Sequence, residues 1–390
     1  MSATEVRGTR STARPVDVSG VIDLVRERAD ASERAARLDD DVLASIRATG
    51  INRLLLPAVL GGFEASPRQC VEAIEPIAAA DGSTGWASAI GFGSNVFAGY
   101  VERDAAAEIF ADPDAPNASM FAPLGNAVAD AGGQLRLTGR WPFTSNCLHA
   151  SWIGVGAFFH DAADRAIDPV PRVVFVPRPA MQVHDTWDVT GMRATGSHHT
   201  SVDAVVVDRA YSHAFGEAAW ADGTLWRLPI FMALVPCLTG VFLGIARGAL
   251  DEIGRQAREG RSAMRTALAD DPLDMADLAT ADTRLRAARA GLLEVLDEAW
   301  ALAEEGIPID RMLQARSILA TLHVVDVSVE ATSTAHRLGG GPAAYNNSRL
   351  LRALRDVQTA RQHTLFAHGL TARLGPSAAG IDVVIPPFVV

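Results

Sequence analysis

The spacing of apolar residues divides the chain into three stretches. Between about residues 19 and 100, apolar positions recur every three or four residues, as on one face of a helix. Asp39 to Asp41 precede one such run as a helix start, Ser66 with Pro67 offers an N-terminal cap, and Ser83 with Thr84 offers another. The first stretch is therefore predicted to be helical.

The apolar period shortens after about residue 118 and lengthens again after about residue 225. Residues 134–138 alternate between polar and apolar, as a half-buried strand does, and similar short runs follow to residue 207. These runs predict an antiparallel β unit. The helical period then returns in long segments typical of a bundle of antiparallel helices, at residues 240–259, 274–305, 309–338 and 348–374.

These patterns predict a mostly α protein with a central β domain. A polar N-terminus precedes a helical domain, and a Pro-rich apolar tail follows the bundle. The expected boundaries are 1–17 for the flexible N-terminus, 18–118 for the helical domain, 119–224 for the β domain, 225–375 for the bundle and 376–390 for the tail.

Residues 228–246 form an uncharged stretch that is long enough to span a membrane. The stretch contains Pro229, Pro236, Gly240 and Gly244, and it lacks an aromatic belt at its far side. Since apolar runs of this kind also occur in protein cores, a buried core helix is favoured over a membrane span.

Composition excludes several functions. The chain has 390 residues and a formal net charge of −11, which disfavours binding to nucleic acid. All 35 basic residues are Arg, so no lysine can form a Schiff base, anchor pyridoxal phosphate or serve a P-loop. No HExxH, GxSxG or spaced GxGxxG motif is present in the sequence.

The cysteines and the N-terminus point to a reducing, cytoplasmic location. Cys70, Cys147 and Cys237 stand far apart with no CxxC motif, so neither a disulfide framework nor a zinc site is expected. His198 and His199 are adjacent and would point to opposite faces of a strand, which disfavours a shared metal. The N-terminus has no apolar run typical of a secretory signal.

The segment GRWPFTSNCLHASW (139–152) is the first candidate for chemistry. If it is a strand, Trp141 and Phe143 share one face and could form a flat wall for a planar ring. The hydroxyls of Thr144 and Ser145 and the amide of Asn146 would then meet the ring's polar edge. Composition alone favours the alternative of a core strand with polar ends, because aromatic-rich strands are common.

Two further segments carry polar residues in tight arrangements. The segment WDVTGMRATGS (187–197) predicts a polar turn around Arg193 that could hold an anion, brace a subunit contact or simply join two strands. In the last long helix, a polar stripe lies on one face and is favoured as a solvated face, with a cofactor-facing surface as the alternative. That stripe consists of Arg352, Asp356, Thr359 and His363.

The order of these motifs resembles the acyl-CoA dehydrogenase superfamily, and more closely its oxygen-using branch. That branch contains the oxygenase components of two-component flavin monooxygenases, among them the p-hydroxyphenylacetate and secosteroid hydroxylases, dibenzothiophene monooxygenase and the actinorhodin-pathway oxygenase. The matching text is ADGSTGW (80–86), GRWPFTSNCLHASW (139–152), WDVTGMRATGS (187–197) and RALRDVQTARQH (352–363). The resemblance spans nearly the whole chain.

The resemblance implies a fold and a cofactor site. It implies a helical N-terminal domain, a middle β-barrel and a C-terminal four-helix bundle, assembled as a homotetramer. FMN or FAD would lie between the β unit and the bundle, completed by a neighbouring subunit. Ser145 and His363 match the catalytic positions of the family, at the reactive edge of the flavin and at its peroxide. The remaining cofactor residues implied are Trp141, Phe143, Thr144, Arg261, Gly340 and Gly341.

The implied activity is hydroxylation of a small aromatic or polycyclic substrate with reduced flavin and O2, through a C4a-hydroperoxyflavin. A separate flavin reductase would supply the reduced flavin, and the chain shows no NAD(P)H-binding fingerprint. Substrate contacts are expected from Asn146, Trp226 and Phe231. Several of these hydroxylases place a His in the helix after the GSTGW motif, whereas residues 90–95 contain none, so this segment offers no His to deprotonate a phenol.

Two alternatives remain open from the sequence. An acyl-CoA dehydrogenase needs a carboxylate base for the α-proton of its thioester, and the position that often carries this Glu is Thr364. Glu252 lies near the region where some relatives carry the base instead. A non-catalytic helical scaffold that binds no flavin is the third possibility.

Overall fold

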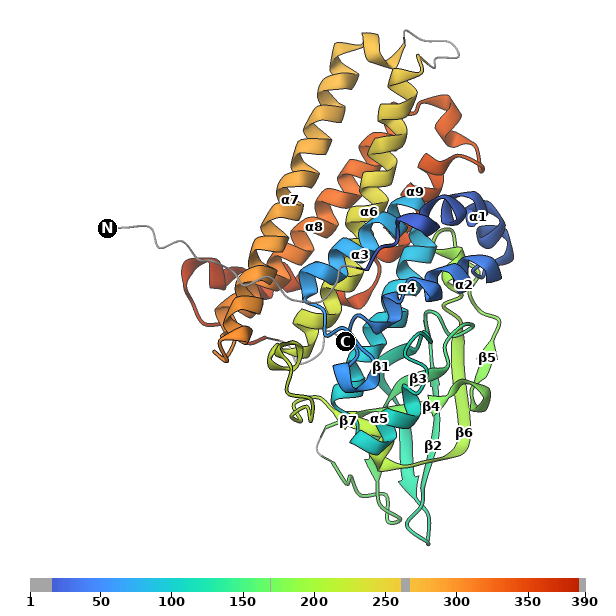
Figure 1. Cartoon of the computed structure of the whole chain (residues 1–390), viewed down its shortest axis with the longest axis vertical. Coiled ribbons are helices and arrows are strands. Elements are labelled where there is room, and N and C mark those ends of the chain that lie inside the picture. The colour runs from blue at the N-terminus through green and yellow to red at the C-terminus, as the bar shows by residue number, and fades with distance from the viewer. Residues whose placement is uncertain (1–15, 169, 261–266, 386–390) are drawn as a thin grey trace.

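The N-terminal part of the chain is helical, as the pattern predicts. The computed structural model describes residues 16–168, 170–260 and 267–385. The helices that precede the first strand are α1 (Ile22–Ala35), α2 (Asp40–Ala48), α3 (Pro67–Ala80), α4 (Gly82–Gly93) and α5 (Arg103–Ile109) (Figure 1). A polar N-cap begins three of them.

The predicted helix start at residues 39–41 and the predicted cap at Ser66 are confirmed. The Asp39 carboxylate accepts from the backbone N–H groups of Asp41 and Val42 at the start of α2. Ser66 forms a capping box with Gln69 at the start of α3. The predicted cap at Ser83 and Thr84 is wrong, because Asp81 caps α4 by accepting from Thr84 N–H at 2.8 Å, which leaves both residues inside the first turn.

The middle of the chain folds into one mixed sheet. Its strands are β1 (Ala118–Ala129), β2 (Leu135–Trp141), β3 (Trp152–His160), β4 (Arg172–Pro177), β5 (Gln182–His184), β6 (His199–Val207) and β7 (Ser212–Ala214). In the described part of the chain they lie in the order β5-β6-β2-β1-β3-β4-β7. The predicted closed barrel is not confirmed by these ladders.

One strand pair departs from the antiparallel prediction. β1 and β3 run parallel, with irregular register around Pro123, while the other neighbours are antiparallel. The segment 142–151 causes this difference, because it leads the chain from the end of β2 back to the start of β1 before β3 begins. The same segment contains the aromatic and hydroxyl residues singled out in the sequence.

Long helices form the C-terminal part of the molecule and stand at the opposite end from the sheet (Figure 1). They are α6 (Ile230–Arg258), α7 (Pro272–Glu304) and α8 (Arg311–Leu338), and the shorter α9 (Arg349–Ala360) packs against α6 and α8. The prediction of one helix over 348–374 is wrong, since the chain leaves the helix after α9 and resumes at α10 (Gly369–Leu374). At the break, His363 has extended backbone angles and its Nδ1 accepts from Leu365 N–H.

Helix α6 packs very closely against α3 through a row of glycines. A Cβ on Gly240 would lie 2.5 Å from Ile74 Cγ2, and one on Gly244 would lie 2.4 Å from the Glu75 carbonyl oxygen. A Cβ on Gly248 would lie 2.3 Å from the Ala79 carbonyl oxygen. Any larger side chain at these positions would therefore push the two helices apart.

Helix α6 also contains the apolar stretch that could have been a membrane span. By length and composition it could cross a membrane, but 78% of its most apolar window is buried inside the protein. The favoured prediction of a core helix is confirmed. The core around it also takes in side chains of α3 and α4 and of Phe175 on β4. The domain boundaries near residues 118 and 224 stay a prediction.

Candidate functional site

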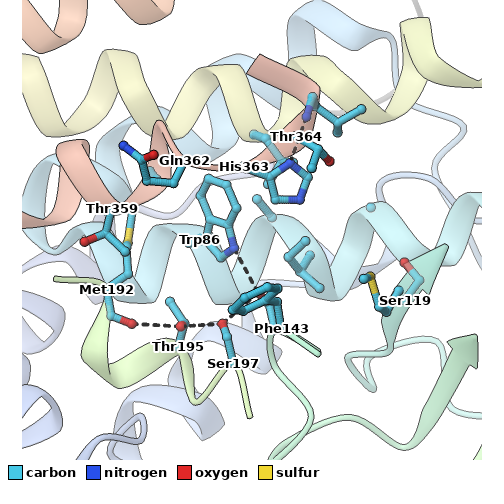
Figure 2. Close-up of a pocket in the computed structure, with 18 of the residues that line it drawn as sticks. Trp86, Ser119, Phe143, Met192, Thr195, Ser197, Thr359, Gln362, His363 and Thr364 are labelled. Atoms are coloured by element: carbon cyan, nitrogen blue, oxygen red, sulfur yellow. Dashed lines mark hydrogen bonds between the residues drawn. The ribbon is translucent and has the colours of Figure 1, made fainter. Parts of the chain in front are cut away.

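A cavity of about 640 Å³ lies where the sheet meets the helices. Its size is typical of small-molecule sites. It is bounded by α4, β1, the N-terminal part of α6, the C-terminal end of α9, and the loops that follow β2 and β5 (Figure 2). The lining side chains used below are Trp86, Ser94, Ser119, Phe143, Ser145, Thr195, Ser197, Phe231, Thr359 and His363.

All four sequence motifs reach this cavity. Trp86 ends the first motif, Ser145 lies in the second, Ser197 ends the third and His363 ends the fourth. They come from positions as much as 277 residues apart in a chain of 390. Their convergence supports a common function, because packing alone does not require polar groups from four segments to meet at one cavity.

A chain of hydrogen bonds connects three hydroxyl groups along one wall. Figure 2 labels two of them, Thr195 and Ser197, together with Trp86. The Trp86 indole N–H donates to Ser145 Oγ at 3.2 Å, and Ser145 Oγ lies 2.7 Å from Ser197 Oγ. Ser197 Oγ lies 2.7 Å from Thr195 Oγ1, which donates to the Met192 carbonyl oxygen at 2.8 Å. We call these groups the hydroxyl chain.

His363 is the only titratable side chain among the described residues that line the cavity. Burial lowers the pKa of His363 to about 4, so its imidazole is neutral at pH 7. Nδ1 accepts from Leu365 N–H at 3.3 Å, which assigns the ring proton to Nε2. The ring lies 5.6 Å from that of Trp86, centroid to centroid. His363 can therefore donate one hydrogen bond without carrying charge.

The polar stripe of the last long helix is not a solvated face. Arg352 and Asp356 are 7% and 2% exposed, and Thr359 lines the cavity. Arg352 pairs with Asp30 and with Glu33 of α1, at 2.9 Å for Glu33. The prediction of solvation is wrong because α1 and the loop after β5 cover this face of α9.

Asp356 fixes that loop to α9. Its Oδ1 accepts from Met192 N–H at 2.5 Å, and a Cβ on Gly191 would lie 2.1 Å from the Arg355 carbonyl oxygen. Burial, with the nearby Asp81 carboxyl adding to it, raises the pKa of Asp356 to about 8. Burial likewise raises the pKa of Asp81 to about 6. The turn predicted at residues 187–197 is thus held by a buried carboxyl.

Trp141 and Phe143 do not share a wall. Trp141 is fully buried in the core of the sheet, where its indole N–H donates to the Gly156 carbonyl oxygen at 2.8 Å. Phe143 has a φ of +59° and lies 61% exposed at the cavity. The expectation of one face is wrong because β2 ends at Trp141 and the alternation of a strand stops there.

Other predicted contacts lie outside the cavity. The Thr144 hydroxyl pairs with that of Thr200 at 2.9 Å. The Asn146 amide donates to the Asn117 carbonyl oxygen at 3.2 Å, and the Trp226 indole N–H donates to that of Val96 at 3.2 Å. None of the three predicted residues lines the cavity, so their side chains serve the surrounding structure.

The remaining predicted residues divide into three groups. Ser145, His363, Phe143 and Phe231 line the cavity. Gly340 and Gly341 do not; Gly340 has a φ of +59° and begins the turn after α8. Arg261 lies outside the described residues.

The part of the cavity lined by Ser94, Ser119 and Phe231 is mostly apolar. Side chains of α4, β1 and α6 line it, and Phe231 stacks on Phe215 with an interplanar angle of 10°. The polar feature there is a pair of hydroxyls, Ser94 Oγ and Ser119 Oγ, 2.7 Å apart. Neither serine was predicted, although Ser94 lies in the segment noted for lacking a His.

Among the described lining residues, none is Asp, Glu or Arg. Thr364 lines the cavity but has no carboxylate, and Glu252 does not line it. Glu252 instead accepts hydrogen bonds from Arg255 and Gln256 on its own helix. The described lining residues therefore do not supply the carboxylate base that an acyl-CoA dehydrogenase needs.

Sequence reasoning missed three residues of the hydroxyl chain. Trp86, Thr195 and Ser197 lie within motifs that were singled out, but no role was assigned to them. The signal that could have found them is that each carries a hydrogen-bonding group and lies next to a glycine, Gly85 or Gly196. Their pairing with Ser145 could not be read from the sequence, because it joins residues 52 and 59 positions apart.

Comparison with known proteins gives consistent matches. The family model "Acyl-CoA dehydrogenase, C-terminal domain" matches residues 237–368. The chain is 36% identical over 355 residues to indole-3-acetate monooxygenase of Pseudomonas putida, with 89% of each chain covered. It is 28% identical over 376 residues to the flavin-dependent monooxygenase, oxygenase subunit HsaA, of Mycobacterium tuberculosis, with 93% of each covered. The solved structure of XiaF from Streptomyces sp., in complex with FADH2 and glycerol, has a TM-score of 0.87 and 25% identity and covers 95% of each chain.

Proposed function

Since the chain belongs to the flavin-dependent monooxygenases that share the acyl-CoA dehydrogenase fold, we propose that its cavity binds reduced flavin and hydroxylates an aromatic ring. The observation that carries this proposal is the convergence of four motifs on one cavity. Among its described lining residues the single titratable group is a neutral imidazole. The missing carboxylate base disfavours the dehydrogenase alternative.

The lining residues fit a flavin ring. An isoalloxazine is flat, with an apolar body and a polar edge, and the cavity offers the aromatic rings of Trp86 and Phe143 beside the hydroxyl of Ser145. When bound, reduced flavin supplies the two electrons with which one atom of O2 enters the product and the other leaves as water. FMN and FAD are both compatible with these residues.

The side chains of the cavity have distinct proposed roles. Ser145 meets the polar edge of the flavin and is held in place by Trp86 and Ser197. His363 offers its Nε2 proton to the oxygen that reacts beside the ring, and its low pKa keeps that donor neutral. The apolar residues of α4, β1 and α6 exclude water from the reacting groups.

The proposed substrate is a neutral aromatic ring. No cationic side chain of the described lining could pair with a buried carboxylate, and burying an unpaired charge is costly. The Ser94 and Ser119 hydroxyls offer a neutral polar contact at the apolar end. Any charged group of the substrate is expected to stay outside the cavity while the ring enters it.

The wider organisation is also proposed. Relatives are named as oxygenase subunits or components, so reduced flavin comes from a separate reductase. We place the protein in the cytoplasm, which its free, buried cysteines support. We further propose a homotetramer in which Gly340 and Gly341 approach the flavin of a neighbouring subunit, since they do not line the cavity of their own chain.

The test combines product and cofactor. The purified protein is mixed with reduced FMN or FAD, ¹⁸O2 and either indole or benzoate, and products are analysed by mass spectrometry. One ¹⁸O atom in hydroxylated indole, with little product from benzoate, is expected. Preferential hydroxylation of benzoate would contradict the neutral-ring proposal. Anaerobic bleaching of tightly bound FAD by an acyl-CoA would instead establish a dehydrogenase.

A further inference from the structure

Both ends of the hydroxyl chain have fixed hydrogen-bonding roles. The Met192 carbonyl oxygen has no proton and can only accept, whereas the Trp86 indole N–H can only donate. The hydroxyls between them each have one proton and can act in either role. Thr195 is fully buried and Ser197 is 3% exposed, so water does not readily supply other partners.

The carbonyl end sets the direction of every proton. Thr195 uses its single proton on the Met192 carbonyl oxygen at 2.8 Å, so it must accept from Ser197 at 2.7 Å. Ser197 has then used its proton and must accept from Ser145 at 2.7 Å. The reverse direction would leave two oxygens 2.8 Å apart at Met192 with no proton between them.

Ser145 is consequently an acceptor toward the cavity. Its own proton is committed to Ser197, and one of its lone pairs already accepts from Trp86 N–H at 3.2 Å. One lone pair is left for a ligand. A ligand atom that meets Ser145 Oγ in this arrangement has to be an N–H or O–H group.

We propose that Thr195 and Ser197 are positioning residues that make Ser145 a hydrogen-bond acceptor and so select reduced over oxidised flavin. This inference rests on the proposed function, in which the polar edge of the ring meets Ser145. N5 of the flavin ring carries a hydrogen only in the reduced form and is an acceptor in the oxidised form. Oxidised N5 would face Ser145 as acceptor to acceptor, which is unfavourable.

Substitution of either positioning residue should release the constraint on Ser145. In Thr195→Val the shape is nearly kept, and the Met192 carbonyl oxygen still accepts from the Trp187 indole N–H at 2.9 Å. The Ser197 proton can then turn toward Ser145, whose own proton becomes free to face the cavity. In Ser197→Ala the Ser145 proton loses its acceptor, with the same consequence.

The matched control is Thr200→Val. Thr200 is also a fully buried threonine, and its hydroxyl pairs with that of Thr144 at 2.9 Å. It does not line the cavity and is not part of the hydroxyl chain. A change common to all three variants would therefore reflect general loosening of the surrounding structure.

The readout is a ratio of dissociation constants, with no substrate present. Oxidised FMN is titrated by fluorescence, and dithionite-reduced FMN is measured by anaerobic ultrafiltration; both are repeated with FAD. The wild type should bind the reduced form more tightly. In Thr195→Val and Ser197→Ala the ratio of oxidised to reduced dissociation constants should fall about tenfold, and in Thr200→Val it should stay unchanged.

Two results would overturn the inference in different ways. If the ratio is unchanged in both Thr195→Val and Ser197→Ala, with flavin still bound, Ser145 does not discriminate the redox states. The proposed function would then remain intact. A wild type that binds neither form would remove the proposed function and the inference with it. Circular dichroism identifies a variant that fails to fold. If Thr195→Val or Ser197→Ala does so, the ratio measured for the other of the two tests the inference.

Discussion

Replacement of the buried Asp356 by Asn should give a protein whose free energy of unfolding exceeds that of the wild type by an amount that grows as pH rises. Asp356 is 2% exposed, and Asp81, Glu33 and Arg352 are the charged groups that act on its carboxyl. Its pKa is raised to about 8 by burial and by Asp81, from 3.8 in the unfolded chain. Asn resembles the protonated acid, does not titrate, and keeps an oxygen that can accept from Met192 N–H.

The sign follows from the number of bound protons. Between the unfolded pKa and the folded pKa of Asp356, the folded wild type keeps a proton that the unfolded chain has lost. Its free energy of unfolding therefore falls by about 1.4 kcal/mol for each pH unit in that window. From pH 5 to pH 7 the variant should gain about 3 kcal/mol over the wild type, or about 3 °C in thermal midpoint for a chain of this length.

The assay is thermal unfolding of both proteins at pH 5, 6 and 7, at constant ionic strength. Asp203→Asn, which changes an exposed carboxylate on β6, is the matched control and should show a constant difference from the wild type. If the difference between Asp356→Asn and the wild type does not grow with pH, Asp356 is ionised throughout. The account of a neutral carboxyl that holds the loop at Met192 would then be refuted.

Two further substitutions test the assignment of roles at the cavity and beside it. His363→Ala should still bind reduced flavin but release about tenfold more hydrogen peroxide per hydroxylated product, because the neutral Nε2 donor is lost. Assays of peroxide and product in the same reaction measure this ratio. An unchanged ratio would contradict the role of His363. Trp141→Phe should lower the free energy of unfolding, measured by denaturant titration, by about 1–3 kcal/mol through loss of the hydrogen bond to Gly156. The dissociation constant for flavin should stay the same. A large loss of flavin affinity in a stable variant would instead place Trp141 in the cofactor site.

The sequence predicted the order of elements well, because periodicity reports local structure. The caps at Asp39 and Ser66 and the long helices α7 and α8 follow from residues close together in the chain. The family resemblance also followed from four short motifs. The parallel pairing of β1 with β3 did not, since it depends on where the intervening segment returns in space.

The site was harder to predict, because its residues act through distant partners. A polar helix face looks solvated from periodicity alone, but Arg352 pairs with Glu33, 319 positions earlier in the chain. The alternation of a strand placed Phe143 beside Trp141, whereas a positive φ at Phe143 reverses its direction. Ser145 and His363 were found through resemblance, and the hydroxyl chain emerged only when their neighbours were seen in space.

The glycine row of α6 has a consequence for synthesis of the chain. Glycine at Gly240, Gly244 and Gly248 weakens an isolated helix by about 1 kcal/mol per position relative to alanine, so α6 depends on its contact with α3. The 149 residues between Ala80 and Ile230 must leave the ribosome first, which takes roughly 7–30 s. During that interval the face of α3 that packs against α6 is uncovered, so the nascent chain presents a binding site for chaperones until α6 emerges.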